Sequence, residues 1–485
     1  MAINAPSRPA SGIDRWFSLS ARGSTYGREI RGGLVTFFTM AYIVVLNPLI
    51  IGTAKDMNGL YVGGTDDVIK AITMVTAATA LIAGLMTILM GAIGRFPMAV
   101  AAGLGLNGFV AFTLAPQMTW ADAMGLVVLE GILILLLVLT GFRSAVFTAV
   151  PEQLKYAIGV GIGLFITIIG LVDSGIVRGG VPLVSFGVFG ELQGWPIFTF
   201  CFGLLLTIVL VVRKVKGAIL IGILATTVLA IIIESIAGVG GKTAENPTGW
   251  GLNVSAVPET IIATPDLGLL GQFSLFGSFE VIGVSASILA IFSLMLSDFF
   301  DTMGTAFGLA TEAELLDEEG NIPHFESILV VDSIAAAAGG IGSVSSNTSY
   351  IESASGIGEG ARTGIASIVT GGLFLIAMFF SPLVTIIPYE AATPALVVVG
   401  FLMMTQIRHI DFNDYSIGIP AFLTIAIMPF TYSITNGIGA GFVSWLVIKI
   451  FTGKAREVNW LMWVISIAYI IYFAIYPIQV VLGLK

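Results

Sequence analysis

Apolar runs recur along the chain from Gly33 to Gly483, and short stretches rich in Gly, Pro and charged residues separate them. A helix needs about 20 predominantly apolar residues to cross a bilayer. By that measure, the pattern predicts spanning segments near residues 31–52, 69–93, 99–115, 122–142, 152–172, 195–213 and 217–237. After a polar stretch at 238–279, it predicts further segments near 281–310, 323–340, 348–359, 362–381, 388–406, 414–432 and 434–452, and a last apolar run at 459–482. The sequence therefore predicts an all-α polytopic membrane protein.

Seven segments, a long loop and seven more indicate two halves, and because seven is odd the second half would be inverted relative to the first. One internal match supports this division. Pro151 begins the fifth segment and Gly163 follows twelve residues later, while Pro388 and Gly400 repeat that spacing in the twelfth segment. We therefore expect 14 transmembrane segments arranged as 7+7 inverted repeats, with the last apolar run as an extra C-terminal hydrophobic helix.

Composition agrees with this prediction and excludes several functions. Of the 485 residues, 56% are hydrophobic and 11% are charged, and the mean hydropathy is +0.99; a soluble domain carries roughly 25% charged residues. The net charge of −9 argues against nucleic acid as a partner, because phosphate binding requires a basic surface. The single cysteine, Cys201, excludes an internal disulfide and a cysteine-based metal site. We expect no cofactor and no metal.

The distribution of basic residues orients the chain in the membrane. If the N-terminus is cytoplasmic and each segment crosses once, 16 of the 21 Lys and Arg residues fall on the inner side and only Lys55, Lys70, Arg178 and Lys242 on the outer side. Cytoplasmic loops are enriched in Lys and Arg, so this split favours a cytoplasmic N-terminus. Residues 1–28 contain no apolar core before a cleavage site, and we therefore predict that the first segment directs insertion without a signal peptide.

The third segment of each half is short and unusually polar. Phe96–Phe109 contains a proline and three glycines, and Gly342–Ser353 contains a run of Ser, Asn and Thr. Extended backbone at membrane depth survives only inside protein or beside a cavity, because unpaired amides are costly in lipid. We predict that each segment is a short extended stretch leading into a half-helix, and that the two half-helix N-termini face each other near the midplane. The alternatives are two packed Gly- and Ser-rich helices and, for Ser349 and Glu352, a capping box that closes a helix start.

Carboxylates inside the apolar segments carry the strongest functional signal. Asp298, Asp301, Thr302 and Thr305 follow the helical spacing i, i+3, i+4, i+7, so they form one polar stripe in the eighth segment. Glu352 lies in the short tenth segment. An acid at the centre of a spanning helix costs roughly 2.5–3.5 kcal/mol, and its presence there indicates a cavity, a bound ligand or a proton pathway. The alternative is a pair of Asp residues near a helix end whose carboxylates reach the headgroups.

Two properties of buried carboxyl groups narrow the function. An ionised carboxylate only accepts hydrogen bonds, so it suits a ligand with N–H groups along one edge. Burial favours the neutral form of the acid, so a proton can load together with the solute. The residues alone thus predict a secondary transporter that binds a polar solute in mid-membrane.

At these residues the sequence resembles the AzgA-like adenine/guanine/hypoxanthine permeases, which belong to the nucleobase–cation symporter (nucleobase–ascorbate transporter) family. The similarity covers nearly the whole chain and is carried by Gly27–Phe37 with Ala41–Ile43 and Asn47-Pro48, by Gly103–Asn107, by Asp298–Thr305 and by Thr348–Ser353. The resemblance implies a core domain that moves against a gate domain in an elevator-type alternating-access mechanism, usually in a homodimer. In this chain the core would comprise 31–150 and 280–382 and the gate 151–237 and 383–452, with a cytoplasmic N-terminal segment at 1–30, an extracytoplasmic loop at 238–279 and a C-terminal hydrophobic segment at 453–485.

The resemblance also implies the substrate and the roles of the site residues. It implies import of a purine nucleobase by proton symport across the cell membrane, which would be a bacterial inner membrane. Asp298 and Glu352 would hydrogen-bond the base, and Asp301 would be linked to proton coupling together with them. Other residues implied at the pocket are Gly105, Asn107, Ile351 and Phe109. Stacking on the purine ring and plain packing both remain open for Phe109, Phe299 and Tyr350.

Other classes of protein compete with this interpretation. An anion transporter of the same fold would require a cationic residue or bare helix N-termini, and the three carboxylates argue against it. An intramembrane aspartyl protease takes its two Asp from two helices and carries a Gly-x-Gly-Asp motif, which this chain lacks, so we predict that the protein is not an enzyme. An uncoupled ion channel stays open as an alternative. The preferred purine and the choice between H⁺ and Na⁺ also stay open.

Overall fold

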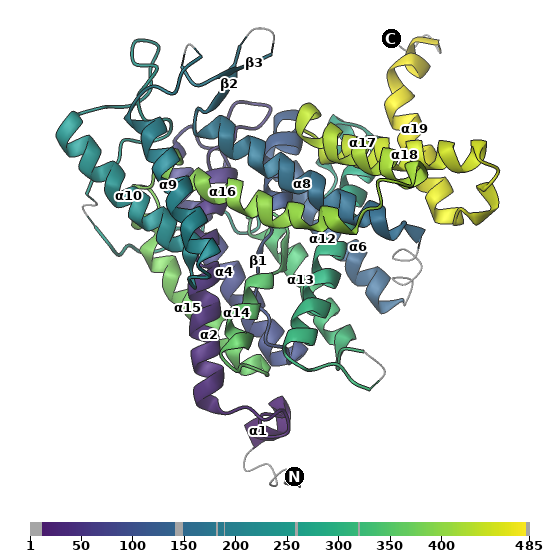
Figure 1. The fold of residues 1–485 in the computed structure, drawn as a ribbon, viewed down its shortest axis with the longest axis horizontal. Helices are drawn as coiled ribbons and strands as arrows, with labels where there is room; N and C mark the ends of the chain where they lie inside the picture. The colour runs from purple at the N-terminus through teal and green to yellow at the C-terminus, as the bar shows by residue number, and fades with distance from the viewer. Residues whose placement is uncertain are drawn as a thin grey trace.

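The computed structural model describes residues 12–140, 149–180, 183–188, 190–257, 260–318 and 321–481. The predicted segments 1–30 and 453–485 therefore lie partly outside the described residues. Figure 1 shows a chain built almost entirely of helices, with two small antiparallel sheets of two strands each among the described residues. Ten helices of the described chain are long and apolar enough to cross a membrane, which agrees with a polytopic membrane protein.

The first half runs from the N-terminus to the polar stretch after residue 237. Its helices are α1 (Gly12–Phe17), α2 (Tyr26–Met40), α3 (Ile43–Ile51), α4 (Val68–Leu89), α5 (Leu104–Phe109), α6 (Trp120–Leu139), α8 (Glu152–Asp173), α9 (Trp195–Val212) and α10 (Ala218–Ala237). Strand β1 (Val100–Ala102) precedes α5, and β2 (Val177–Gly179) pairs with β3 (Val184–Phe186) between α8 and α9. The short helix α5 continues as a π-helical turn, Val110–Leu114.

The second half begins after that stretch. Its helices are α11 (Gly277–Val281), α12 (Val284–Glu312), α13 (Phe325–Ile341), α14 (Ala354–Gly358), α15 (Gly364–Ala377), α16 (Tyr389–Met404), α17 (Tyr415–Thr431), α18 (Ile434–Phe451) and α19 (Trp460–Val481). Strand β4 (Asn347–Ser349) and a 3-10 turn (Ile351–Ser353) precede α14. The last apolar run is helical, as predicted, and α19 packs against α18.

The two short polar segments meet at the centre of the protein as a pair of antiparallel strands. Val100 lies opposite Ser349, and Ala102 lies opposite Asn347. All six residues of β1 and β4 are buried, and their pairing satisfies backbone groups that would otherwise be costly at this depth. The predicted extended stretches are thus confirmed, and each leads into a short helix.

The alternative capping box at Ser349 and Glu352 does not form. The first residue before the 3-10 turn is Tyr350, and no side chain caps that turn. The Ser349 hydroxyl instead donates to Asp332 Oδ1 at 3.0 Å. The segment predicted near 348–359 begins within β4, which pairs with β1, and continues through the 3-10 turn into α14.

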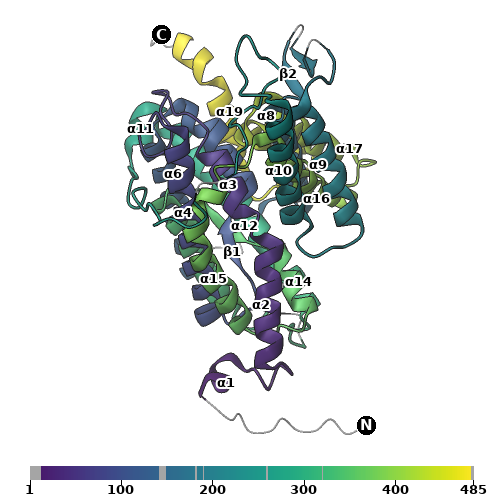
Figure 2. The ribbon, with the colours of Figure 1, turned by 90° about the vertical axis from the view of Figure 1, so that its left-hand side faces the viewer.

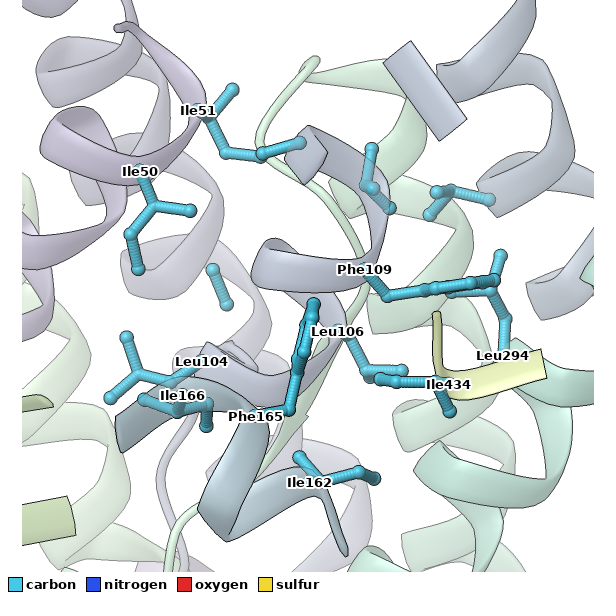
Figure 3. Close-up of a cluster of buried hydrophobic side chains, with 14 of the residues drawn as sticks. Ile50, Ile51, Leu104, Leu106, Phe109, Ile162, Phe165, Ile166, Leu294 and Ile434 are labelled. Carbon is cyan, nitrogen blue, oxygen red and sulfur yellow. The ribbon is translucent and has the colours of Figure 1, made fainter. Parts of the chain in front are cut away.

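The helices pack in two sets, and strands β1 and β4 lie within the first. In the first set α6 packs on α13 and α12, and α4 packs on α3 and α15; α2 lies between α14 and α15 (Figure 2). In the second set α8 packs on α16 and α17, and α9 packs on α10 and α16. An apolar cluster joins the two sets, as Figure 3 shows: Leu104, Leu106 and Phe109 of α5 meet Ile162, Phe165 and Ile166 of α8.

The glycines of the internal sequence match, Gly163 and Gly400, face each other where α8 crosses α16. A Cβ atom built on Gly400 would lie 2.5 Å from the Gly163 carbonyl oxygen, and one on Gly163 would lie 2.6 Å from the Gly400 carbonyl oxygen. The two backbones can approach this closely only because both positions lack a side chain.

We expect Gly400→Ala to destabilise the protein by about 1–3 kcal/mol, because the added methyl group must push α8 and α16 apart. Thermal unfolding of the detergent-purified protein measures this effect. The matched control is Gly372→Ala in α15, where a Cβ atom would meet nothing within 4 Å. Equal melting temperatures for the two variants would contradict the proposed close contact.

Candidate functional site

A cavity of about 860 Å³ lies between the two sets of helices. One wall comes from the first set and includes Tyr42, Asp301, Thr348 and Glu352; the other comes from α8, α16 and the 3-10 turn that follows α16. Pockets of this size hold small organic ligands. The cavity is therefore the first candidate for a solute site.

Glu352 reaches the cavity from the 3-10 turn that follows β4. The Tyr42 hydroxyl donates a short hydrogen bond to Glu352 Oε1. Tyr42 is almost fully buried at the junction of α2 and α3, so it holds the carboxylate from behind. This arrangement leaves the rest of the Glu352 carboxylate directed toward the cavity as an acceptor. Tyr42 lies in the Ala41–Ile43 stretch that carries the family resemblance, but sequence reasoning did not identify it as a site residue.

Asp301 lies on the cavity wall, but Asp298 does not. Ser297, Asp301 and Thr305 line the cavity as one row along α12. Asp298 and Thr302 form a second row that is fully buried behind the wall. Residues three apart on a helix differ in direction by about 60°, and β4 packs against α12 at this point. The single polar stripe expected from the sequence is therefore split between two environments.

The start of α5 forms another part of the wall. Gly103, Leu104, Gly105 and Leu106 line the cavity, and no side chain caps this helix start. A Cβ atom on Gly105 would lie 2.4 Å from Ile162 Cγ2 of α8, so glycine permits α8 to pack directly over α5. Ile351 also lines the cavity and is half exposed.

Of the remaining residues considered for the pocket, Tyr350 lines the cavity, whereas Asn107, Phe109 and Phe299 do not. Asn107 is fully buried on α5, away from the cavity wall, and neither of its side-chain polar atoms has a hydrogen-bond partner among the described residues. Phe109 points into the apolar cluster of Figure 3 and packs there. Phe299 is buried in the same cluster. Tyr350 lines the cavity, but its hydroxyl donates to the Ala102 carbonyl at 2.6 Å.

Two further acids inside the membrane were not singled out from the sequence. Glu130 of α6 and Asp332 of α13 are fully or almost fully buried, and both lie near Asp298. Each is an acid within a long apolar segment, so the rule that identified Asp298 also applies to them. No group of three or more His, Cys, Asp and Glu in the described part of the chain is arranged to hold a metal ion.

Comparisons with known proteins agree with a transport fold. A model of the Permease family matches residues 27–440. The guanine/hypoxanthine permease PbuG of Bacillus subtilis is 35% identical over 465 residues, which cover 94% of this chain and 98% of that protein. The adenine permease AdeQ of Escherichia coli is 34% identical over 452 residues, which cover 92% of this chain and 93% of that protein. The transmembrane domain of the cyanobacterial bicarbonate transporter BicA has a similar fold, with a TM-score of 0.55 at 14% identity over 88% of this chain and 97% of that domain.

The placement of the two aspartates can be tested by thiol labelling. In a background with Cys201→Ala, which leaves no native cysteine, we expect Asp301→Cys to react with a small water-soluble thiol reagent. Asp298→Cys, one turn away and fully buried, is the matched control and should react at least about tenfold more slowly, because a thiol must be accessible to be modified. Similar labelling rates would contradict the split stripe.

Proposed function

This chain belongs to the Permease family, a family of membrane transport proteins and not of enzymes, and from that premise we propose that it imports purine nucleobases by proton symport. The substrates are bases of the adenine, guanine and hypoxanthine class. The two relatives described above carry names of purine permeases and align over nearly their full lengths, which supports this substrate class.

The observation that carries the proposal is that Glu352 and Asp301 line one cavity of suitable size. A purine presents N–H donors and ring acceptors along its edge, and carboxylates accept hydrogen bonds from such donors. We assign contact with the base to Glu352 and Asp301, with Gly105 and Ile351 flanking it. Asp298 lies behind this wall, so we assign it to proton coupling and not to direct contact. Asn107 also lies off the cavity wall, so we do not assign it to contact with the base.

We propose an elevator-type movement of two domains within a 7+7 inverted repeat of 14 segments. The core comprises 31–150 and 280–382, and the gate comprises 151–237 and 383–452. Three observations support this assignment: the antiparallel pairing of β1 with β4, the contact of Gly163 with Gly400, and the division of helices into two packed sets with the cavity between them. A shift of one set past the other would expose the cavity to the opposite side of the membrane.

We further propose a homodimer in a bacterial inner membrane with a cytoplasmic N-terminus. The excess of Lys and Arg on the predicted inner side supports this orientation.

Transport of an anion by the same fold is the second candidate, because BicA has this fold and Lys155 lines the cavity. Three carboxylates that line the cavity, Glu152, Asp301 and Glu352, disfavour it, since they would repel a negative solute.

Uptake into proteoliposomes tests the function. We expect the wild-type protein to accumulate labelled adenine, guanine or hypoxanthine when the external pH is lower than the internal pH. Glu352→Gln removes the acceptor charge and should reduce accumulation at least about a hundredfold. The control is Glu457→Gln, an exposed residue paired with Lys449 at 2.8 Å, which should transport normally. Failure of the wild type to take up any of the three bases under any ion gradient would reject the proposal.

Tyr42→Phe tests the support of Glu352. Hydrogen bonds to charged groups contribute about 1.5–3 kcal/mol, so loss of the hydroxyl should weaken purine binding by about tenfold or more. Isothermal titration of the purified protein gives the affinity. The matched control is Tyr469→Phe. Tyr469 is buried and does not line the cavity, and its hydroxyl oxygen lies 3.0 Å from the Ser293 hydroxyl oxygen. Unchanged affinity in Tyr42→Phe would show that Tyr42 does not position the carboxylate.

A further inference from the structure

A second group of carboxyls lies behind the cavity wall. Glu130 of α6, Asp298 of α12 and Asp332 of α13 come from three different helices, and none is more than 2% exposed. Asp298 lies close enough to both of the others to interact with them electrostatically. The remaining titratable group that faces the cluster is Asp301 on the cavity side, and no Lys, Arg or His of the described chain is among its neighbours.

These carboxyls have more acceptor atoms than the protein supplies with donors. Glu130 Oε1 accepts from the Ser346 hydroxyl at 3.2 Å, but Glu130 Oε2 has no hydrogen-bond partner in the described chain. Both carboxylate oxygens of Asp298 also lack a hydrogen bond of regular geometry among the described residues, although the Thr348 hydroxyl lies close by. Neighbouring carboxylates without a cation cannot all be ionised in a buried space. The cluster must therefore hold at least one proton.

A row of hydroxyl groups joins this cluster to the cavity. Ser349 donates to Asp332 Oδ1 at 3.0 Å, and Thr302 donates to Ser349 Oγ at 3.3 Å. The Thr302 and Thr348 hydroxyl oxygens are 3.1 Å apart. Thr348 and Ser349 are themselves part of the cavity wall. A hydroxyl can donate and accept at once, so such a row can pass a proton from cavity water to a carboxylate.

We propose that Glu130, Asp298 and Asp332 form an internal proton site, separate from the base-facing carboxyls, that is loaded from the cavity through Thr348, Thr302 and Ser349. Loading is balanced: Ser349 gives its hydroxyl proton to the Asp332 carboxylate and takes one from Thr302, which is replenished through Thr348 from cavity water. Release runs in reverse toward the other side of the membrane. The ligand that we propose for this cluster is a proton, which the hydroxyl row can deliver from the cavity. The inference rests on the proposed proton-coupled uptake.

The test separates movement of the base from its coupling to protons. Glu130→Gln and Asp332→Asn mimic the protonated, neutral acids and are reconstituted in proteoliposomes. We expect exchange of labelled for unlabelled adenine, or for hypoxanthine if the wild type prefers it, to stay within about twofold of wild type. Accumulation driven by a pH gradient should fall at least tenfold and lose its dependence on external pH.

Glu29→Gln is the control for loss of a buried carboxylate. Glu29 is fully buried, but its oxygens accept from the backbone N–H groups of Arg362, Thr363 and Ala366 at 2.9–3.3 Å. This variant should lower thermal stability and leave the pH profile of accumulation unchanged. If either cluster variant is not monodisperse on gel filtration, Thr302→Val replaces it in the test. This substitution removes the relay hydroxyl at similar side-chain volume, and we again expect exchange to be kept and pH-driven accumulation to fall.

Three results would overturn the inference. The first is wild-type accumulation with an unchanged pH profile in the cluster variants. The second is loss of exchange together with accumulation in well-folded variants, which would make these acids structural. The third is wild-type accumulation that follows a Na⁺ gradient and ignores a pH gradient. Absence of any purine transport by the wild type would instead reject the proposed function, and the two failures are thereby distinguishable.

Discussion

The site depends on one constraint, which is that extended backbone deep inside a membrane protein must find hydrogen-bond partners within the protein. The chain meets it by pairing β1 of the first half with β4 of the second. This pairing brings two short helices from distant parts of the sequence to the same place. It also fixes a row of Ser and Thr side chains on β4 between the cavity and the acids of α12 and α13. Strand β4 thus separates the cavity from the buried acids, and its hydroxyl groups contact both.

Much of this architecture can be predicted from the sequence. Apolar runs define the helices, and Pro97 with its neighbouring glycines, together with the Ser and Asn run before Thr348, predicts the extended stretches. The internal match of Gly163 with Gly400 identifies two positions that touch in the structure. Local signals suffice here because each reflects a local physical requirement, such as apolar length, missing side chains or unpaired amides.

The site was less predictable because side-chain direction depends on tertiary contacts. A polar stripe on one helix does not reveal that β4 divides it, so Asp298 and Asp301 could not be assigned to different environments. Glu130 and Asp332 could have been found, since each is an acid in an apolar segment. Their convergence on Asp298 could not, because it results from the packing of α6, α12 and α13. Tyr42 gave no local signal, and only the fold brings it to Glu352.

The side-chain-free crossing of α8 and α16 has a mechanical consequence. The two helices are in backbone contact at one point, and the rings of Tyr156 and His409 meet at one end of the pair, with centroids 4.9 Å apart and planes tilted by 34°. Helices held together at two points resist bending more than either helix alone. The cavity wall that α8 and α16 form therefore behaves as one rigid unit and not as two independent helices. One end of this pair lies near Asp173 and Glu390, and the other end lies about 30 Å away for a helix of this length. The two ends of this pair of helices therefore cannot change position independently of each other.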